Sequence, residues 1–219
     1  MIIAIDGPSG SGKTTLGRML AHALKLLYLD TGSMYRAVAL AVIEAGMDPN
    51  DKASVTALAN RIDIDLEGNP DCLCVLLDGR DVTEQIRTES VTDMSSIVST
   101  IPGVRRAMVE RQRAMGKRGA VLNGRDIGTV VFPDADIKFF LTAAPEERAE
   151  RRYKEDHITA LSSVSYAETL ADMIERDRRD STRADSPLKI ADDAVVIDST
   201  GKNIDEVFAE MMTYVHRHN

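Results

Sequence analysis

Apolar positions near the start of the chain follow two different periods. Residues 2–5 form a continuous apolar run, which is typical of a strand buried on both faces. Residues 15–27 then carry apolar side chains at helical spacing, residues 26–29 form a second apolar run, and residues 34–45 predict a second helix. The order strand, helix, strand, helix predicts a parallel sheet with right-handed crossovers.

The pattern changes in the middle of the chain. Residues 62–67 alternate between apolar and acidic side chains, which predicts a strand with one solvated face. A small antiparallel element with helices would interrupt the parallel pattern, so we predict an inserted subdomain at about residues 60–105. The elements predicted here are strands at 62–67 and 72–77, turns at 68–71 and 78–81, and helices at 83–98 and 103–115.

Apolar runs and helical segments return after this insert. The strands predicted here are residues 119–122, 137–141 and 194–198, and the helices are 145–153, 169–179 and 204–215. With the two strands near the N-terminus, the sequence predicts an α/β fold in which a five-stranded parallel sheet is flanked by helices. Ligands bind such sheets beyond the carboxyl ends of the strands.

Composition narrows the classes of partner. A chain of 219 residues with 43% hydrophobic residues can bury a full core as one domain with insertions. Its apolar runs are too short to span a bilayer, and the first strand begins without a signal peptide before it. We therefore expect a cytoplasmic protein with no membrane partner. The two cysteines, Cys72 and Cys74, are too few for a zinc site and are predicted to act as small hydrophobic residues.

Charge is unevenly distributed along the chain. The formal net charge of −8 argues against a nucleic-acid partner, which would require a broad basic surface. Local arginine clusters in an acidic protein suit small, highly anionic ligands bound in a cleft. The clusters are Arg105, Arg106, Arg111 and Arg113, then Arg148, Arg151 and Arg152, and then Arg176, Arg178, Arg179 and Arg183.

A glycine-rich loop directly follows the first predicted strand and precedes the first predicted helix. It matches the pattern of Gly, any four residues, and Gly-Lys-Ser/Thr, in which backbone N–H groups surround an anion. Lys13 would reach the β- and γ-phosphates of a nucleoside triphosphate, and the Thr14 hydroxyl would face Mg²⁺. The loop residues are Gly7, Pro8, Ser9, Gly10, Ser11, Gly12, Lys13 and Thr14.

Two nearly identical turns compete for a role in the chemistry. Residues 78–82 read Asp-Gly-Arg-Asp-Val and residues 123–127 read Asn-Gly-Arg-Asp-Ile. Because the second turn follows a predicted core strand, it would project into the cleft, and we place the chemistry on Arg125 and Asp126. Arg36, which follows the second strand, is a candidate for holding a second phosphate or, equally, a solvated helix residue.

The abundance of arginine bears on the type of acceptor. Phosphoryl transfer needs positioning and charge neutralisation, and an acceptor that is itself a phosphate needs no general base. An alcohol acceptor usually requires a carboxylate or histidine to take its proton. The chain has many arginines and four histidines, none at a catalytic or metal-binding spacing. This supply favours a phosphate acceptor.

Five sequence blocks together resemble the bacterial cytidylate kinase family, and they occur in the order of that family. The resemblance covers residues 2 to about 215, and the Gly-Arg-Asp-Ile-Gly-Thr and Glu-Arg-Asp blocks make it specific. The blocks are the glycine loop, residues 30–36, residues 124–134, residues 146–152 and residues 175–180.

The resemblance implies an adenylate-kinase-like P-loop fold that transfers the γ-phosphate of ATP to CMP or dCMP with Mg²⁺. We expect a monomer. The implied parts are a core at residues 1–35, 117–145 and 170–219, a monophosphate-binding region at 36–116, and a short lid at about 146–168.

The resemblance also implies roles for individual residues. Gly7 to Thr15 would hold ATP, with Mg²⁺ held by Thr14, by Thr15 or by neither, since many members have glycine at the position of Thr14. The residues implied to grip phosphates are Arg36, Arg125 and Arg176. Those implied to recognise cytosine are Thr31, Arg105, Asp126 and Arg183. Ser96 and Asp180 would meet near the pentose, and Arg148, Arg151 and Arg152 would close from the lid.

Two other functions compete with this one. A small P-loop kinase with an alcohol acceptor, such as a shikimate or dephospho-coenzyme A kinase, would need a base and no insert. A nucleotide-binding switch would signal without turning over a substrate. Guanine-specific switches use Asn-Lys-x-Asp, and no Asn in this chain is followed by Lys.

Overall fold

The computed structural model describes residues 1–158 and 164–218. The predicted five-stranded parallel sheet is confirmed, with strand order β2-β6-β1-β7-β8 in the described residues. Its strands are β1 (Ile2–Asp6), β2 (Leu27–Asp30), β6 (Ala120–Gly124), β7 (Ile137–Thr142) and β8 (Val195–Asp198). The helices of the core are α1 (Lys13–Leu24), α2 (Thr31–Glu44), α5 (Pro102–Gly116), α6 (Pro145–Ile158), α7 (Tyr166–Thr182) and α8 (Ile204–Arg217).

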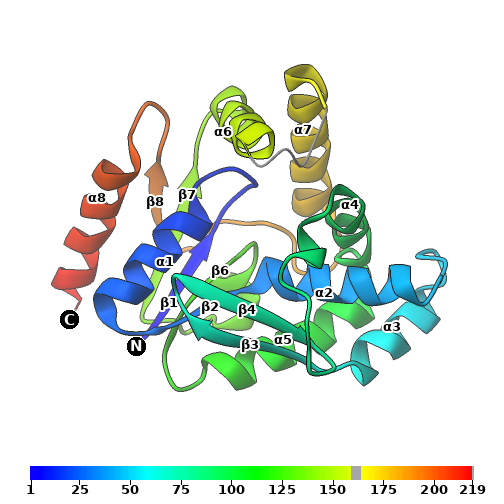
Figure 1. Cartoon of the computed structure of the whole chain (residues 1–219). Coiled ribbons are helices and arrows are strands. Elements are labelled where there is room, and N and C mark those ends of the chain that lie inside the picture. Colours follow the sequence, from blue (N-terminus) through cyan, green and yellow to red (C-terminus); the bar gives the residue numbers. More distant parts are fainter. Residues whose placement is uncertain (159–163, 219) are drawn as a thin grey trace.

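Successive side chains of the central strand enter two different cores. Ile3 and Ile5 pack with α1 and α8 on one face of the sheet, whereas Ala4 packs with α2 and α5 on the other. Figure 1 shows α1 and α8 side by side, with α6 and α7 over the end of the sheet where the glycine loop lies. Because both faces are covered, the strands are continuous apolar runs, as the sequence indicated.

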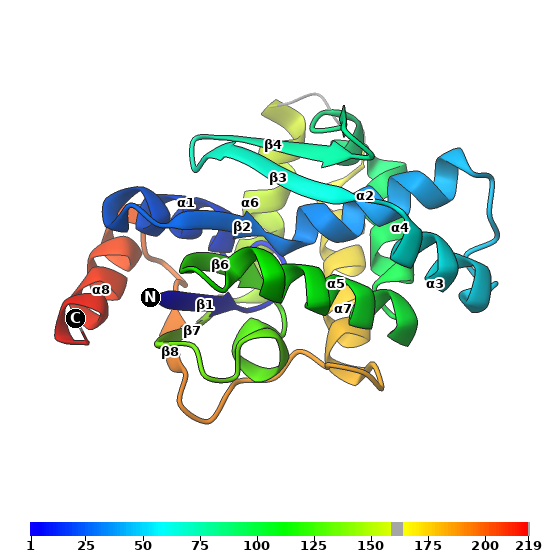
Figure 2. The ribbon, with the colours of Figure 1, turned by 90° about the horizontal axis from the view of Figure 1, so that it is seen from below.

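The insert forms a separate antiparallel sheet, as predicted. This sheet has the order β3-β4-β5, and Figure 2 shows β3 and β4 as a long hairpin beside α1 and α2. Its apolar side chains join those of α2 in one core, so the hairpin packs onto the body of the protein. The elements of this region are α3 (Lys52–Arg61), β3 (Ile64–Asn69), β4 (Cys72–Leu77), β5 (Arg80–Asp81), a 3₁₀ turn η1 (Gln85–Arg87) and α4 (Glu89–Val98).

The structure corrects several predicted boundaries. Helix α1 begins at Lys13 and ends at Leu24, because Lys25 adopts a left-handed conformation with φ of 55° that terminates the helix before β2. Helix α3 was not predicted, since its buried positions are few. The single helix expected at 83–98 is two elements, because the extended backbone of Thr88 separates η1 from α4. In the described part of the chain, we find no helix long and apolar enough to cross a membrane.

Helices α3 and α5 cross where Gly103 faces Thr56. A Cβ atom at Gly103 would overlap the Thr56 side chain and lie 2.9 Å from its Cβ. We therefore expect Gly103→Ala to lower the free energy of unfolding by about 1–3 kcal/mol, despite the higher helix propensity of alanine. Urea unfolding measures this loss. Thr56→Ala removes the two nearest atoms but keeps the Cβ at 2.9 Å, so it should restore part of the stability, and a Gly103→Ala variant as stable as the parent would contradict the close crossing.

Candidate functional site

A cavity of about 650 Å³ opens at the carboxyl ends of β1, β2 and β6. Its wall combines the glycine loop, the start of α2, the turn after β6, arginines from α6 and α7, parts of the insert, and the loop between β8 and α8. All the residues predicted for the site line this cavity except four. The four are Gly7, Pro8, Ser96 and Arg148.

Two glycines give the loop its shape. A Cβ atom at Gly7, where φ is 146°, would overlap the carbonyl oxygen of Leu141 in β7. Gly12, with φ of 90°, turns the chain into α1. Lys13 folds back over this loop, and its amine donates to the carbonyl of Pro8 at 2.5 Å and to Ser11 Oγ at 3.3 Å. The loop thus presents a helix N-terminus and a lysine to the cavity.

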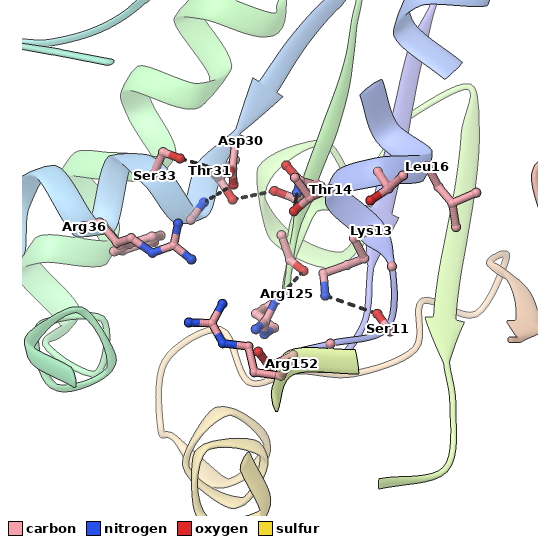
Figure 3. A pocket seen from close by; sticks show the side chains of 18 of the residues that line it. Ser11, Lys13, Thr14, Leu16, Asp30, Thr31, Ser33, Arg36, Arg125 and Arg152 are labelled. Atoms are coloured by element: carbon pink, nitrogen blue, oxygen red, sulfur yellow. Dashed lines mark hydrogen bonds between the residues drawn. The ribbon is translucent and has the colours of Figure 1, made fainter. Parts of the chain in front are cut away.

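Five cationic side chains converge beside the loop. Lys13, Arg36, Arg125 and Arg152 point into one space in Figure 3, and Arg176 lines the same cavity. Burial, followed by repulsion from Arg125, lowers the pKa of Lys13 well below its ordinary range and that of Arg176 to about 10. Burial also lowers the pKa of Arg36, with Arg152 and Arg125 adding repulsion. This concentration of positive charge would be stabilised by a polyanion.

Deeper in the cavity, arginines and carboxylates alternate. Arg105 donates to Asp126 Oδ2 at 2.5 Å and to the carbonyl of Ser99 at 3.1 Å, and it is nearly fully buried. Arg183 lies 3.9 Å from Asp126 and donates to Asp180 Oδ1 at 3.3 Å. The network holds Asp126 between two guanidinium groups, facing the cavity.

Asp180 links this network to the cationic group. Its Oδ2 accepts a hydrogen bond from Arg125 Nε at 2.9 Å. Burial alone would raise the pKa of the Asp180 carboxyl, but Arg125 and Arg176 hold it below its ordinary value. The ring of Tyr35 packs against Arg105, with its centroid 5.3 Å from the guanidinium carbon. The arginines are therefore held in place before any ligand binds.

Oxygen and amide groups at the edge of the loop bear on metal binding. Asn123 Nδ2 donates to Thr14 Oγ1 at 3.3 Å, and Asn123 Oδ1 is buried without a hydrogen-bond partner. Thr31 donates to the carbonyl of Asn123 at 2.7 Å. Among the described residues, no group of three His, Cys, Asp or Glu side chains is arranged to hold a metal. A magnesium ion would therefore need phosphate oxygens as ligands in addition to Thr14 or Asn123.

The three arginines predicted for the lid have different surroundings. Arg152 lines the cavity, and Arg151 donates to the carbonyl of Ser199 at 2.8 Å. Arg148 is buried beneath the glycine loop, where it donates to the carbonyl of Ser9 at 2.9 Å and pairs with Asp177 at 2.7 Å. The structure thus places Arg148 as a support of the loop. The segment 159–163 of the predicted lid lies outside the described residues.

The two Gly-Arg-Asp turns lie in different surroundings, one at the cavity and one at the protein surface. Arg125 and Asp126 line the cavity, whereas Arg80 pairs at 2.6 Å with Glu44 and Asp81 bonds to Thr83, both exposed. Only the turn that follows a core strand lines the cavity, so the placement of the chemistry on Arg125 and Asp126 stays a prediction that this geometry permits.

The insert contributes other residues to the cavity than the one expected. Ser96, expected near the pentose, does not line the cavity and accepts a hydrogen bond from Arg179 at 3.0 Å. Thr92, Ser95 and Ser99, which were not predicted, line it instead. The loop after β8, from Ser199 to Ile204, also lines it. That loop follows a core strand, so the rule that sites lie at the carboxyl ends of parallel strands could have found it.

Comparisons with known proteins agree with these features. The profile of the cytidylate kinase family matches residues 3–217. A cytidylate kinase of Geobacter sp. (strain M21) is 48% identical over 212 residues, covering 96% of this chain and 91% of that protein. One from Carboxydothermus hydrogenoformans is 44% identical, covering 100% and 99%.

A structural comparison supports the fold alone. An uncharacterized protein from Eubacterium ventriosum ATCC 27560 has a TM-score of 0.55 at 12% identity, covering 99% of this chain and 98% of that one. The sequence comparisons are far stronger, because they span nearly the whole chain at almost half identity. The chain therefore belongs to the cytidylate kinase family.

Proposed function

We propose that this protein transfers the γ-phosphate of ATP to CMP or dCMP, giving ADP and CDP or dCDP. The observation that carries the proposal is the cationic group between the glycine loop and the Asp126 network. Lys13, Arg36, Arg125, Arg152 and Arg176 lie where the phosphates of two nucleotides would meet end to end. Two polyanions repel one another, and guanidinium groups offset that repulsion.

ATP would bind with its phosphates on the glycine loop. The backbone N–H groups of the loop and the N-terminus of α1 favour phosphate, and Lys13 would leave Pro8 to contact the β- and γ-phosphates. The adenine would extend toward the loop at 199–204, which lines the same cavity. Thr14 and Asn123 offer oxygens that suit a magnesium ion shared with the phosphates, and that ion would neutralise charge on the transferred group.

CMP would bind with its base against Asp126. The cytosine amino group is a hydrogen-bond donor and complements the carboxylate, and the ring nitrogen and O2 are acceptors that complement Arg105 and Arg183. In UMP a carbonyl oxygen replaces the amino group and would face the carboxylate. That mismatch leaves a buried polar group unpaired and should disfavour UMP.

The transfer itself would need no general base. A phosphate monoester is mostly dianionic at pH 7, so its oxygen can attack directly in line with the leaving ADP. Arg36, Arg125 and Arg176 would orient both phosphates and stabilise the charge of the transition state. The lining carboxylates in the described part of the chain all have partners, which disfavours an alcohol acceptor: Asp30 caps α2, and Asp126, Glu155 and Asp180 pair with arginines.

A substrate panel tests this proposal. With ATP and Mg²⁺, we expect release of ADP with CMP and dCMP, at least about 100-fold lower kcat/KM with UMP, and little turnover with AMP, shikimate or dephospho-coenzyme A. Coupled detection of ADP measures each rate. Phosphorylation of shikimate or dephospho-coenzyme A instead of CMP would favour an alcohol kinase, and no transfer to any acceptor would favour a nucleotide switch.

A further inference from the structure

Asp6 is a buried carboxylate that neither the loop motif nor the substrate contacts proposed above account for. It ends β1, the central strand of the sheet, and directly precedes Gly7 of the glycine loop. Only 4% of its surface is exposed. Its two oxygens accept one backbone hydrogen bond each, from the N–H groups of Ile127 and Gly128, both at 2.8 Å. The carboxylate therefore joins the start of the glycine loop to the turn that carries Asp126.

The contacts of Asp6 explain the orientation of Asp126. Asp126 precedes the single helical turn η2 (Ile127–Val131), in the position where an aspartate ordinarily accepts the N–H of the second or third residue of the helix, here Gly128 or Thr129. Its side chain makes no such bond and points to Arg105 instead. Because Asp6, on the neighbouring strand β1, already accepts the N–H of Gly128, the second residue of the turn, that bond is closed to Asp126, whose carboxylate bonds to Arg105 and lines the cavity.

We propose that Asp6 is a positioning residue, which sets Arg125 and Asp126 for recognition of the monophosphate by holding the amides of Ile127 and Gly128, the second of which Asp126 could otherwise cap. This inference rests on the proposed function. Asp6 would act only on the protein backbone and would not contact a nucleotide. Its carboxylate would thereby fix the distance between the glycine loop, which would hold ATP, and the turn at 125–126, which would bind CMP.

Burial of Asp6 lowers the stability of the fold, which supports a functional reason for its presence. Burial raises its pKa from 3.8 to about 6, against the backbone bonds from Gly128 and Ile127 that lower it. Since the folded chain holds this proton more tightly than the unfolded chain, the free energy of unfolding falls as pH rises from 3.8 to about 6, and the loss is complete above that range. At neutral pH Asp6→Asn would remove that penalty but lose one of the two backbone hydrogen bonds, so the two effects largely offset.

Asp6→Asn tests the inference, because it keeps the shape but places an NH₂ group against one backbone N–H. We expect kcat/KM for CMP to fall about 10- to 100-fold, the factor for one hydrogen bond to a charged group, and the preference for CMP over UMP to fall about 10-fold. The KM for ATP should change less than about twofold, and the Tm should fall by no more than about 2 °C. A purely structural role would instead lower Tm and impair both substrates together.

Asp136→Asn is the matched control. Asp136 also accepts a backbone N–H of β1, that of Ile2 at 2.6 Å, but at the end of the strand remote from the cavity. Asp136→Asn should therefore leave the preference for CMP over UMP unchanged.

Gly128→Ala is a second variant, to be used if Asp6→Asn does not fold. Its Cβ would lie 3.0 Å from Lys138 Cδ and 3.5 Å from Asp6 Oδ2, so it crowds the contact between Asp6 and the Gly128 amide without changing charge and should reduce selectivity in the same direction.

The outcomes separate this inference from the proposed function. Wild-type protein that does not phosphorylate CMP would overturn the proposed function. If the wild-type protein phosphorylates CMP, and both Asp6→Asn and Gly128→Ala keep the wild-type preference for CMP over UMP, the proposed role of Asp6 is wrong while the proposed function stands. Equal loss of ATP and CMP affinity in Asp6→Asn, with a lower Tm, would also overturn it.

Discussion

Replacing Arg125 with alanine is expected to lower kcat about 10³-fold, because its guanidinium lies at the centre of the cationic group and would stabilise the transferred phosphate. The fold should survive. Asp180, the partner of Arg125 at 2.9 Å, keeps Arg183 at 3.3 Å, so no buried carboxylate is left alone. Steady-state kinetics with saturating ATP and CMP measures kcat, and thermal unfolding should show a small change in Tm.

Two further variants sharpen the Arg125 experiment. Arg80→Ala removes the equivalent arginine from the exposed twin turn and should leave kcat unchanged. Arg125→Lys keeps the charge but cannot make the forked contacts of a guanidinium, so it should recover only part of the lost rate. If Arg125→Ala turns over CMP like the wild type, the charge-neutralisation mechanism is wrong.

The fold was largely readable from the sequence because its strongest signals are local. The apolar run at 2–5 and the spacing from Leu16 to Leu24 predict β1 and α1, and both are buried as expected. The end of α1 was not readable, because it depends on Lys25 adopting a left-handed conformation that residue type does not favour. Helix α3 was missed because tertiary packing against α5, more than its own pattern, stabilises it.

The candidate site was predicted where motifs carry it and missed where contacts between distant segments decide. The glycine loop and the turn at 124–126 each follow a core strand, so topology alone brings them together. Arg148 looked like the other lid arginines in sequence, yet its hydrogen bond to the carbonyl of Ser9 and its pairing with Asp177 of α7 place it beneath the loop. The part played by Asp6 depends on amides 121 and 122 positions away, and no local pattern reports such a pair.

Asp126 is expected to have the largest effect on both specificity and stability. Asp126→Asn keeps the volume but presents an oxygen and an NH₂ group, so it can accept from the cytosine amine or donate to the uracil carbonyl. We therefore expect the ratio of kcat/KM for CMP over UMP to fall at least about 100-fold, mainly by loss of CMP activity. Asp81→Asn, from the exposed twin turn, is the matched control and should leave the ratio unchanged.

Asp126→Ala should in addition destabilise the fold by about 3–5 kcal/mol, because it leaves the buried guanidinium of Arg105 without its carboxylate at 2.5 Å. Arg105→Met in the same chain removes the unpaired charge and should recover much of that stability without restoring selectivity. Urea unfolding and the CMP/UMP ratio thus report two different roles of one side chain. If Asp126→Ala is as stable and selective as the wild type, neither the buried ion pair nor the proposed recognition of cytosine can be correct.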